Sequence, residues 1–341
     1  MTSTGMLAWR VSELGEPRDV LRLVDVERPT PGPGQLVVRV LAVPANFPDA
    51  LMCRGLYQVR PELPFTPGAE LCGEVVAVGA GVTGLAPGDR VIGAPTMPYG
   101  GFAELALLEA AMTFPAPEAL DDAEAASLFI GYQTGWFALH RRTRLQPGET
   151  LLVHAAAGGV GSAAVQLGKA AGATVIGVVG GEAKAEVARQ LGADVVVDRH
   201  REDFVAVVKE YTDGRGADVI YDPVGGDTYD RSTKCIAFEG RILVIGFAGG
   251  RIQEAALNHA LIKNYSIIGL HWGLYNTRNP GVVRACHDEL TALAAQGLIK
   301  PLVSERLGLD QVADGVQRLA DGDTVGRVVF IPALAGVGQN P

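Results

Sequence analysis

The sequence predicts an α/β protein of two domains, a β-rich domain followed by a doubly wound parallel sheet. Residues 1 to about 125 carry short β-type runs such as 36–41, separated by turn sequences of proline, glycine and aspartate. From about residue 126 short apolar strands alternate with helical segments, which is typical of βαβ units. A glycine-rich turn at 154–161 joins the first strand and helix of this alternation. These three observations predict the fold class.

The alternating segments define the expected order of elements in the second domain. We expect strands at 150–154, 174–179, 194–197, 218–222, 241–246 and 265–270, with helices at 159–171, 183–191 and 202–212. A helical stretch at 282–296 and a strand at 326–331 follow, and we expect them to return to the first domain. The predicted domains are therefore residues 1–125, completed by about 275–341, and residues 126–274. The small-residue tail at 333–341 is expected to fray.

The glycine-rich turn has the order strand, turn and helix that a dinucleotide-binding site requires. It reads His154-Ala155-Ala156-Ala157-Gly158-Gly159-Val160-Gly161, so alanine occupies the first slot of the strict G-x-G-x-x-G pattern. A helix that begins here presents free N–H groups and its positive dipole end to a pyrophosphate. A tight structural turn is the alternative. The candidate cofactor residues are Ala156, Gly158, Gly159, Val160 and Gly161.

Composition excludes several classes of protein. The 341 residues are 48% hydrophobic and carry a net charge of −9, which disfavours a general nucleic-acid or anionic-membrane surface. We find no uninterrupted apolar run near the roughly 18 residues of a membrane span and no leader segment, so cytoplasmic residence is expected. The four cysteines form no C-x-x-C pair, and neither a zinc knuckle nor a disulfide framework is predicted.

Several short motifs carry a resemblance to a known family. They are Asn46-Phe47-Pro48-Asp49, Arg54-Gly55-Leu56-Tyr57, Pro67-Gly68-Ala69-Glu70, the run 73–79 and Pro87-Gly88-Asp89-Arg90-Val91, followed by the Ala-Ala-Gly-Gly-Val-Gly turn. The chain resembles the medium-chain dehydrogenases/reductases, and within them the zinc-independent NADPH:quinone oxidoreductases related to ζ-crystallin. The resemblance implies a GroES-like catalytic domain and a Rossmann dinucleotide-binding domain.

The positions that hold catalytic zinc in the family's alcohol dehydrogenases correspond to Asn46, Ala69 and Ile130. Alanine and isoleucine cannot donate a lone pair to a cation, so no metal is expected at this site. The cysteine run of the family's structural zinc is absent as well. The six histidines show no ligand-type spacing.

The cofactor can be argued from the end of the second strand of the parallel sheet. NAD-specific folds place an acidic residue there, whereas this chain has Val178-Val179-Gly180-Gly181. The resemblance implies that Gly180, Lys184 and Arg199 contact the 2′-phosphate side of the cofactor, so NADPH is favoured over NADH. Glu182 lies nearby, and Lys184 and Arg199 are ordinary surface charges in the alternative interpretation.

The resemblance also implies further cofactor contacts. It places Thr134 beside the nicotinamide and Gly246-Phe247-Ala248 along its ring, and the carboxyl end of a parallel strand is independently a ligand-binding position. Arg327 reaches the cofactor edge in one interpretation and is a solvated residue of the last strand in the other.

Asn46 and Tyr57 are the predicted catalytic residues, and Asn46 is also predicted to contact the cofactor. A hydride donor without a metal needs donors that stabilise the charge developing on the acceptor oxygen, and Asn46 through its amide N–H and Tyr57 through its phenol supply them. Tyr57 could also simply pack at a domain edge, and Asn46 could cap a turn. Asp49 and Glu70 are expected to be structural anchors.

The leading hypothesis is an NADPH-dependent reductase of quinones or similarly activated enones. Reduction of a 2-enoyl thioester is a related alternative, for which basic residues such as Arg54, Arg60, Arg141, Arg142 and Arg278 are candidates without demonstrated convergence. A non-catalytic NADPH sensor or structural protein is an alternative from another class. The resemblance further implies a homodimer that pairs through the strand 265–270, which would cover an exposed sheet edge.

Overall fold

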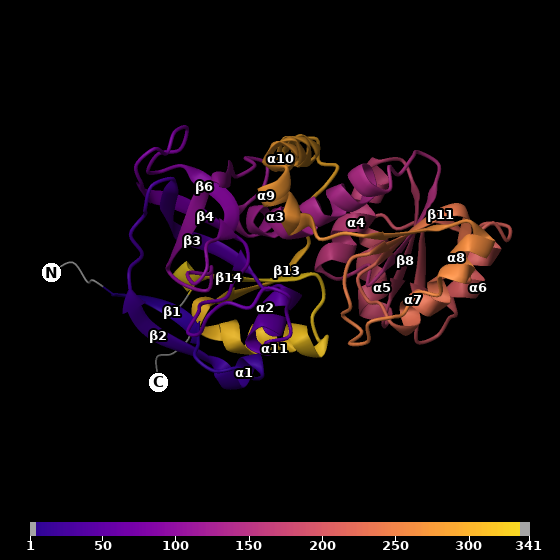
Figure 1. Ribbon diagram of the computed structural model, residues 1–341, viewed down its shortest axis with the longest axis horizontal. Helices are drawn as coiled ribbons and strands as arrows, with labels where there is room; N and C mark the ends of the chain where they lie inside the picture. The colour runs from indigo at the N-terminus through magenta and orange to yellow at the C-terminus, as the bar shows by residue number, and fades with distance from the viewer. Residues whose placement is uncertain (1–4, 335–341) are drawn as a thin grey trace. The chain divides into compact units, whose positions relative to one another are not determined.

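The computed structural model describes residues 5–334, and the chain forms two compact units (Figure 1). The first contains the residues up to Phe129 together with those from Pro301 onward, and the second runs from Ile130 to Lys300. Of the tail expected to fray, only Ala333 and Leu334 lie within the described residues.

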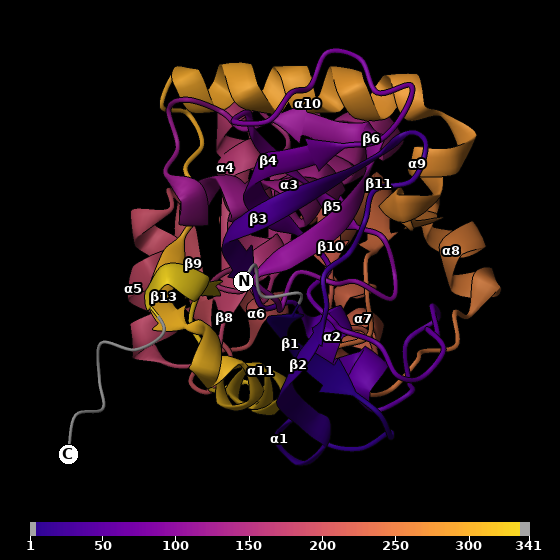
Figure 2. The same ribbon diagram turned by 90° about the vertical axis from the view of Figure 1, so that its left-hand side faces the viewer.

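The first unit is built mainly on antiparallel β-structure, with one parallel pair formed by its two C-terminal strands (Figure 2). A hairpin of β1 and β2 accompanies a six-stranded sheet of order β13-β14-β3-β4-β5-β6, and β6 also pairs with β3, so this part of the sheet closes on itself. The elements are β1 (Gly5–Val11), α1 (Pro17–Val20), β2 (Leu21–Glu27), β3 (Gln35–Pro44), α2 (Phe47–Cys53), β4 (Leu71–Val78), β5 (Arg90–Pro95), β6 (Leu105–Pro115), β13 (Val303–Gly308), α11 (Val312–Asp321) and β14 (Arg327–Ile331), and α3 (Asp122–Trp136) begins here.

Strand β14 places a C-terminal segment of the chain beside β3 in the sheet of the first unit. It pairs antiparallel with β3, with Val329 opposite Pro44 and Phe330 opposite Val43, and Phe330 is fully buried against Phe102. The buried apolar side chains of β3, α2 and α11 form one core with it, which anchors the returning strand through burial of apolar surface. The pairing places Arg327, at the start of β14, next to the end of β3.

The second unit is a doubly wound parallel sheet. Its strand order is β12-β11-β10-β7-β8-β9, and every neighbouring pair is parallel. The elements are the π-helical turn η1 (Phe137–Arg142), β7 (Thr150–His154), α4 (Gly159–Ala170), β8 (Thr174–Val179), α5 (Glu182–Gln190), β9 (Val195–Asp198), α6 (Phe204–Tyr211), β10 (Ala217–Asp222), α7 (Asp227–Ser232), β11 (Ile236–Val244), α8 (Leu257–Lys263), β12 (Ser266–Gly269), α9 (Tyr275–Arg278) and α10 (Pro280–Ala295). The predicted α/β class, a β-rich domain with a doubly wound parallel sheet, is confirmed.

Two details differ from the sequence prediction. Strand β11 begins five residues earlier than expected, because a bulge with Glu239 at φ 59° lets Ile236 pair with Ala217 before the regular register starts. Helix α10 falls in the second unit, whereas the sequence interpretation assigned residues from about 275 to the first. The preceding helix α9 already packs in the second unit, since the ring of its Tyr275 stacks on Phe137 at 4.2 Å between centroids, and α10 follows it directly.

No helix within residues 5–334 combines the length and the apolar character needed to cross a lipid bilayer.

Candidate functional site

The turn after β7 has the geometry of a nucleotide-binding loop. Ala155, in the slot of the first glycine, takes a left-handed φ of 51°, and the N–H of Ala156 donates to Val178 of β8 at 3.1 Å. Gly158 caps α4, since its carbonyl accepts the N–H of Ser162 at 2.8 Å. The turn therefore directly follows β7 and is fixed by hydrogen bonds to β8 and to the first turn of α4. Ala155 adopts the conformation for which glycine is usually selected.

Gly161 permits this turn because no side chain fits there. A Cβ atom built on it would lie 2.1 Å from the carbonyl oxygen of Ala155. Within the described residues, nothing accepts a hydrogen bond from the N–H groups of 159–161, the first three residues of α4. These open donors and the helix dipole suit a pyrophosphate.

The predicted nicotinamide-contacting segment Gly246-Phe247-Ala248 follows β11 and lies at the carboxyl ends of β10 and β11. The N–H of Ile245 donates to Asp222 at 3.0 Å and the N–H of Ala248 donates to Pro223 at 3.1 Å, so this loop follows the end of β10 closely. Phe247 stays partly exposed between them. Thr134 is buried on α3. The Gly246-Phe247-Ala248 segment therefore stands at the edge of the sheet where parallel folds bind ligands.

Arg199 lies over Gly180 at the end of β8. A Cβ atom on Gly180 would meet the Arg199 Nε at 3.1 Å, and the exposed Arg199 guanidinium has no carboxylate partner among residues 5–334. Glu182, which argued against NADPH, instead pairs with Arg189 at 3.0 Å and Arg201 at 3.5 Å. Lys184 is half-buried on α5. The positive charge of Arg199 therefore lies beside Gly180, at the end of β8, and is available to bind an anion.

Asp198 is an acidic residue that the sequence interpretation missed. It ends β9 opposite Val179, and its Oδ1 accepts the N–H groups of Gly181 at 2.9 Å and His200 at 3.1 Å. These hydrogen bonds lower the pKa of Asp198. In the sequence, Asp198 is visible only as an aspartate that follows the apolar run 195–197. Its position near the end of β8 can be recognised only once β9 is known to lie beside β8.

In the first unit, Asn46 sits where β3 ends and α2 begins. It is buried, and its backbone N–H donates to the Asp49 Oδ2 at 2.8 Å. The other Asp49 oxygen accepts the N–H of Gly68 at 3.0 Å. Asp49 therefore joins the start of α2 to the segment before β4.

Both ends of the Asn46 amide are held by a buried ion pair. Its Oδ1 accepts from the Arg327 Nη1 at 3.0 Å, its Nδ2 donates to the Glu70 Oε1 at 3.0 Å, and Arg327 pairs directly with Glu70. The Arg327 side chain is 5% exposed and that of Glu70 is 0% exposed. The interpretation of Arg327 as a solvated residue is therefore wrong, because the pairing of β14 with β3 carries it into the interior.

The amide donors of Asn46 are engaged inside the protein. Besides the bond to Glu70, Nδ2 makes a longer one of 3.4 Å to the Pro44 carbonyl. The sequence interpretation assigned an amide N–H of Asn46 to the acceptor oxygen. Only the weak bond to Pro44 could be exchanged for such an oxygen without breaking the ion-paired arrangement.

Tyr57 is half-buried and packs against the core of the first unit. Burial raises the pKa of its phenol, and the charge of Asp49 raises it further. The phenol is therefore protonated at neutral pH and able to donate. The structure brings Asn46, Asp49, Glu70, Tyr57 and Arg327 together in one unit, and Asp49 and Glu70 are more closely tied to Asn46 than the sequence indicated.

Metal-binding side chains do not gather anywhere in residues 5–334: no group of three or more His, Cys, Asp or Glu could hold an ion. The four cysteines are buried free thiols, and burial raises the pKa of Cys53, Cys72 and Cys235 to about 12. They are protonated at neutral pH, so thiolate ligation is disfavoured.

The buried carboxyl of Asp49 predicts a pH-dependent stability. Burial raises its pKa from 3.8 to about 7, outweighing the N–H donors of Asn46 and Gly68, and the charge of Glu70 adds to the rise. The folded state then binds a proton that the unfolded state releases, so this contribution to stability is full below pH 3.8 and is lost as the pH rises to about 7. We expect the unfolding free energy of the wild type to fall over this range relative to Asp49→Asn, by up to about 1.4 kcal/mol per pH unit.

Urea unfolding of both proteins at several pH values measures this difference. Asp49→Asn itself is expected to be less stable throughout, because its amide cannot accept both backbone N–H groups, so the comparison is of slopes. Parallel slopes between pH 4 and 7 would contradict the raised pKa.

Comparison with known proteins agrees with this architecture. Residues 32–118 match the alcohol dehydrogenase GroES-like domain and residues 159–288 the zinc-binding dehydrogenase family. A quinone oxidoreductase-like protein 2 homolog of Nematostella vectensis is 40% identical over 332 residues, covering 96% of this chain and 90% of the relative. The chain belongs to the medium-chain dehydrogenase/reductase superfamily, in its quinone oxidoreductase-like branch. A quinone oxidoreductase of Pseudomonas aeruginosa is 36% identical, covering 92% of this chain and 96% of the relative.

Solved structures of this superfamily share the whole fold. The Escherichia coli quinone oxidoreductase complexed with NADPH is 32% identical with a TM-score of 0.88, covering 96% of this chain and 100% of that one. A mycobacterial protein complexed with NADPH is 33% identical, also with a TM-score of 0.88 and the same coverage. The family resemblance drawn from the motifs is confirmed.

Proposed function

We propose that this protein is an NADPH-dependent reductase that transfers a hydride to quinones or similarly activated α,β-unsaturated carbonyls without a catalytic metal. The observation that carries the proposal is the turn 155–161, whose open helix N–H groups can donate hydrogen bonds to a pyrophosphate and whose Gly161 excludes any side chain. The NADPH complexes of two similar structures support the choice of cofactor. Bound NADPH supplies the hydride.

The residues of this chain would bind the cofactor and polarise the acceptor. Arg199, positively charged and without a carboxylate partner in residues 5–334, would hold the 2′-phosphate, with Lys184 nearby. Tyr57 would donate its phenolic proton toward the acceptor oxygen, and the Asn46 amide, fixed by Glu70 and Arg327, would orient that oxygen. Asn46, Ala69 and Ile130 stand at the family's zinc-ligand positions, and this donor set supports chemistry without zinc.

Oxidation of NADPH by the purified, metal-chelated protein tests the proposal. We would run a benzoquinone, a simple enone, a 2-enoyl-CoA and a blank in parallel, and expect rapid turnover with the quinone or the enone. Preference for the thioester would move the function to enoyl reduction, and tight NADPH binding without turnover would favour a sensor.

Tyr57→Phe should lower kcat about a hundredfold with an enone and less with a quinone, whose product anion is delocalised.

Cofactor preference should depend on Arg199. We expect Arg199→Ala to lower kcat/KM for NADPH at least about tenfold while leaving kcat/KM for NADH nearly unchanged, since only NADPH carries the 2′-phosphate. Arg201→Ala is the matched control, because Arg201 already pairs with Glu182 and Asp198. Equal losses with both cofactors would exclude a role specific to the phosphate.

We also propose a homodimer formed through the edge of the parallel sheet. Strand β12 ends the sheet, and α8, immediately before it, has no buried residue and exposes large apolar side chains: Leu257, Leu261 and Ile262. Covering such a surface stabilises an assembly.

Light scattering should give twice the chain mass, and Leu261→Glu should reduce it to one chain mass. The control Leu56→Glu, at another exposed leucine, should leave the mass unchanged. A monomer at micromolar concentration would refute this assembly.

A further inference from the structure

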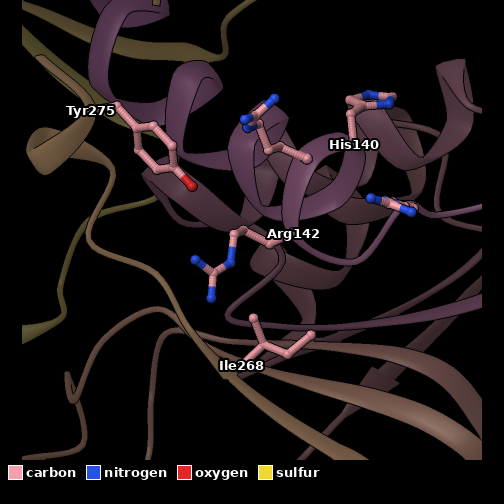
Figure 3. Close-up of a pocket in the computed structure, with 6 residues that line it drawn as sticks. His140, Arg142, Ile268 and Tyr275 are labelled. Carbon is pink, nitrogen blue, oxygen red and sulfur yellow. The ribbon is translucent and has the colours of Figure 1, made fainter. Parts of the chain in front are cut away.

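The second unit contains a cationic pocket that the proposed reaction does not use. Its lining residues come from η1 and the turn after it, from β12 and from α9, and the cavity measures about 590 Å³. The lining is His140, Arg141, Arg142, Arg144, Ile268 and Tyr275 (Figure 3). None of the predicted cofactor residues is among them. The volume falls within the range of small-molecule sites.

Local backbone geometry explains why side chains adjacent in sequence share one cavity. The turn η1 is π-helical, with the N–H of Thr143 donating to the carbonyl of Ala138, five residues earlier, at 3.0 Å. Arg144 then takes a left-handed φ of 52°. In a regular α-helix consecutive side chains diverge by about 100°, whereas here Arg141, Arg142 and Arg144 all line one pocket.

The three guanidinium groups are not neutralised. No carboxylate within residues 5–334 forms an ion pair with Arg141, Arg142 or Arg144, although the chain as a whole is acidic with a net charge of −9. By contrast, Arg241 in the same unit makes two bonds to Glu149, at 2.7 and 2.8 Å. Burial lowers the pKa of His140, against the opposing charge of Glu289 on α10, so its imidazole adds donors and acceptors rather than charge.

Two further lining residues of the pocket are apolar or aromatic. Ile268 of β12 contributes an aliphatic side chain, and the Tyr275 ring is fixed by stacking on Phe137. Figure 3 shows the phenol oxygen of Tyr275 pointing into the space that the Arg142 side chain also enters. The lining therefore combines cationic groups that match an anion with an aliphatic side chain and a phenol that match an organic group with a hydrogen-bond acceptor.

We propose that this pocket binds a small phosphorylated molecule, with its phosphate oxygens on the three guanidinium groups and its organic part along Ile268 and Tyr275. A guanidinium group can form paired hydrogen bonds to two phosphate oxygens. Three arginines without acidic partners therefore favour a phosphate group over a monoanion. The site is distinct from the glycine-rich turn, so the proposal does not depend on the proposed reductase activity.

The test is a calorimetric titration of the full-length protein, in its solution oligomeric state and saturated with NADPH, with pyrophosphate and with phenyl phosphate. Saturation with NADPH blocks phosphate binding at the glycine-rich turn. We expect both probes to bind, and Arg142→Gln combined with Arg144→Gln to weaken them at least about tenfold. The matched control, Arg60→Gln combined with Arg278→Gln, removes two exposed arginines outside the pocket and should change neither affinity by more than about twofold.

A separate variant tests the organic half of the site. Ile268→Asn should weaken phenyl phosphate more than pyrophosphate. NADPH affinity and the unfolding temperature of each variant report whether the second unit remains folded. Absence of binding to NADPH-saturated protein would overturn the proposal, as would binding that the arginine substitutions leave unchanged. Binding that appears only after the oligomer dissociates would also overturn it, and would assign the pocket to acidic side chains of a second copy.

Discussion

Replacing Gly161 by valine is expected to abolish NADPH binding, with at least about a 100-fold increase in Kd. The cause is steric and local. The first atom of any side chain at this position would lie 2.1 Å from the Ala155 carbonyl oxygen and 3.1 Å from the Ala156 Cα, both backbone atoms that cannot rotate away. The turn must therefore open, and the N–H groups at the start of α4 lose the arrangement in which they can donate hydrogen bonds to a pyrophosphate.

Fluorescence or calorimetric titration with NADPH measures this effect, with circular dichroism to follow the fold. Gly281→Ala is the matched control, because Gly281 lies in the same unit on α10 and a Cβ there meets nothing within 4 Å. It should bind NADPH as the wild type does and be slightly more stable. A Gly161→Val protein that retains wild-type affinity would show that the cofactor binds elsewhere.

Replacing Arg327 by leucine is expected to lower the free energy of unfolding by about 3–5 kcal/mol. The substitution leaves the Glu70 carboxylate in the interior without its guanidinium and removes the donor to the Asn46 Oδ1. We also expect kcat to fall in protein that remains folded, because the Asn46 amide is then held only through Nδ2, by Glu70 and Pro44, and its Oδ1 is no longer fixed.

Two further variants separate the contributions to this loss. Arg18→Leu breaks the pair with Asp314, whose partners are 56% and 60% exposed, and should cost less than about 1 kcal/mol. The double variant Arg327→Leu with Glu70→Leu should recover most of the stability, since no buried charge is left unpaired, without restoring kcat. Denaturant unfolding and steady-state kinetics provide the two readouts. A loss with Arg327→Leu no larger than that with Arg18→Leu would contradict the buried ion pair.

The parallel sheet and its glycine-rich turn could be predicted from sequence because their signals are local. The apolar runs 150–153 and 174–179 flank a turn whose glycine spacing is set by contacts between residues a few positions apart, such as Gly161 and Ala155. The contact between Gly180 and Arg199 could be predicted only with the further knowledge that β8 and β9 are neighbouring strands. The missed Asp198 ends the second of these strands, and only the register against Val179 places it beside Gly181.

The candidate catalytic cluster was predictable only in part. Asn46 and Asp49 lie three residues apart, and their contact at the start of α2 is a local capping interaction. Glu70 and Arg327 are 24 and 281 positions from Asn46, and no periodicity or spacing indicates that they meet. The basic run 140–144 was visible as charge, but its convergence depends on a π-helical turn and on a left-handed residue that the sequence does not signal.

The sequence by itself determined the two-domain α/β class and the turn that suits a dinucleotide, because hydrophobic periodicity and glycine spacing are properties of short segments. The superfamily was indicated by the resemblance of short motifs such as 46–49, 67–70 and 87–91 to those of a known family. The tertiary structure alone decided the burial of Arg327, the anchoring of Asn46 at both ends of its amide and the grouping of three arginines in one pocket. Each of these depends on pairing or packing between distant segments, whose free energy comes from the assembled core rather than from any local pattern.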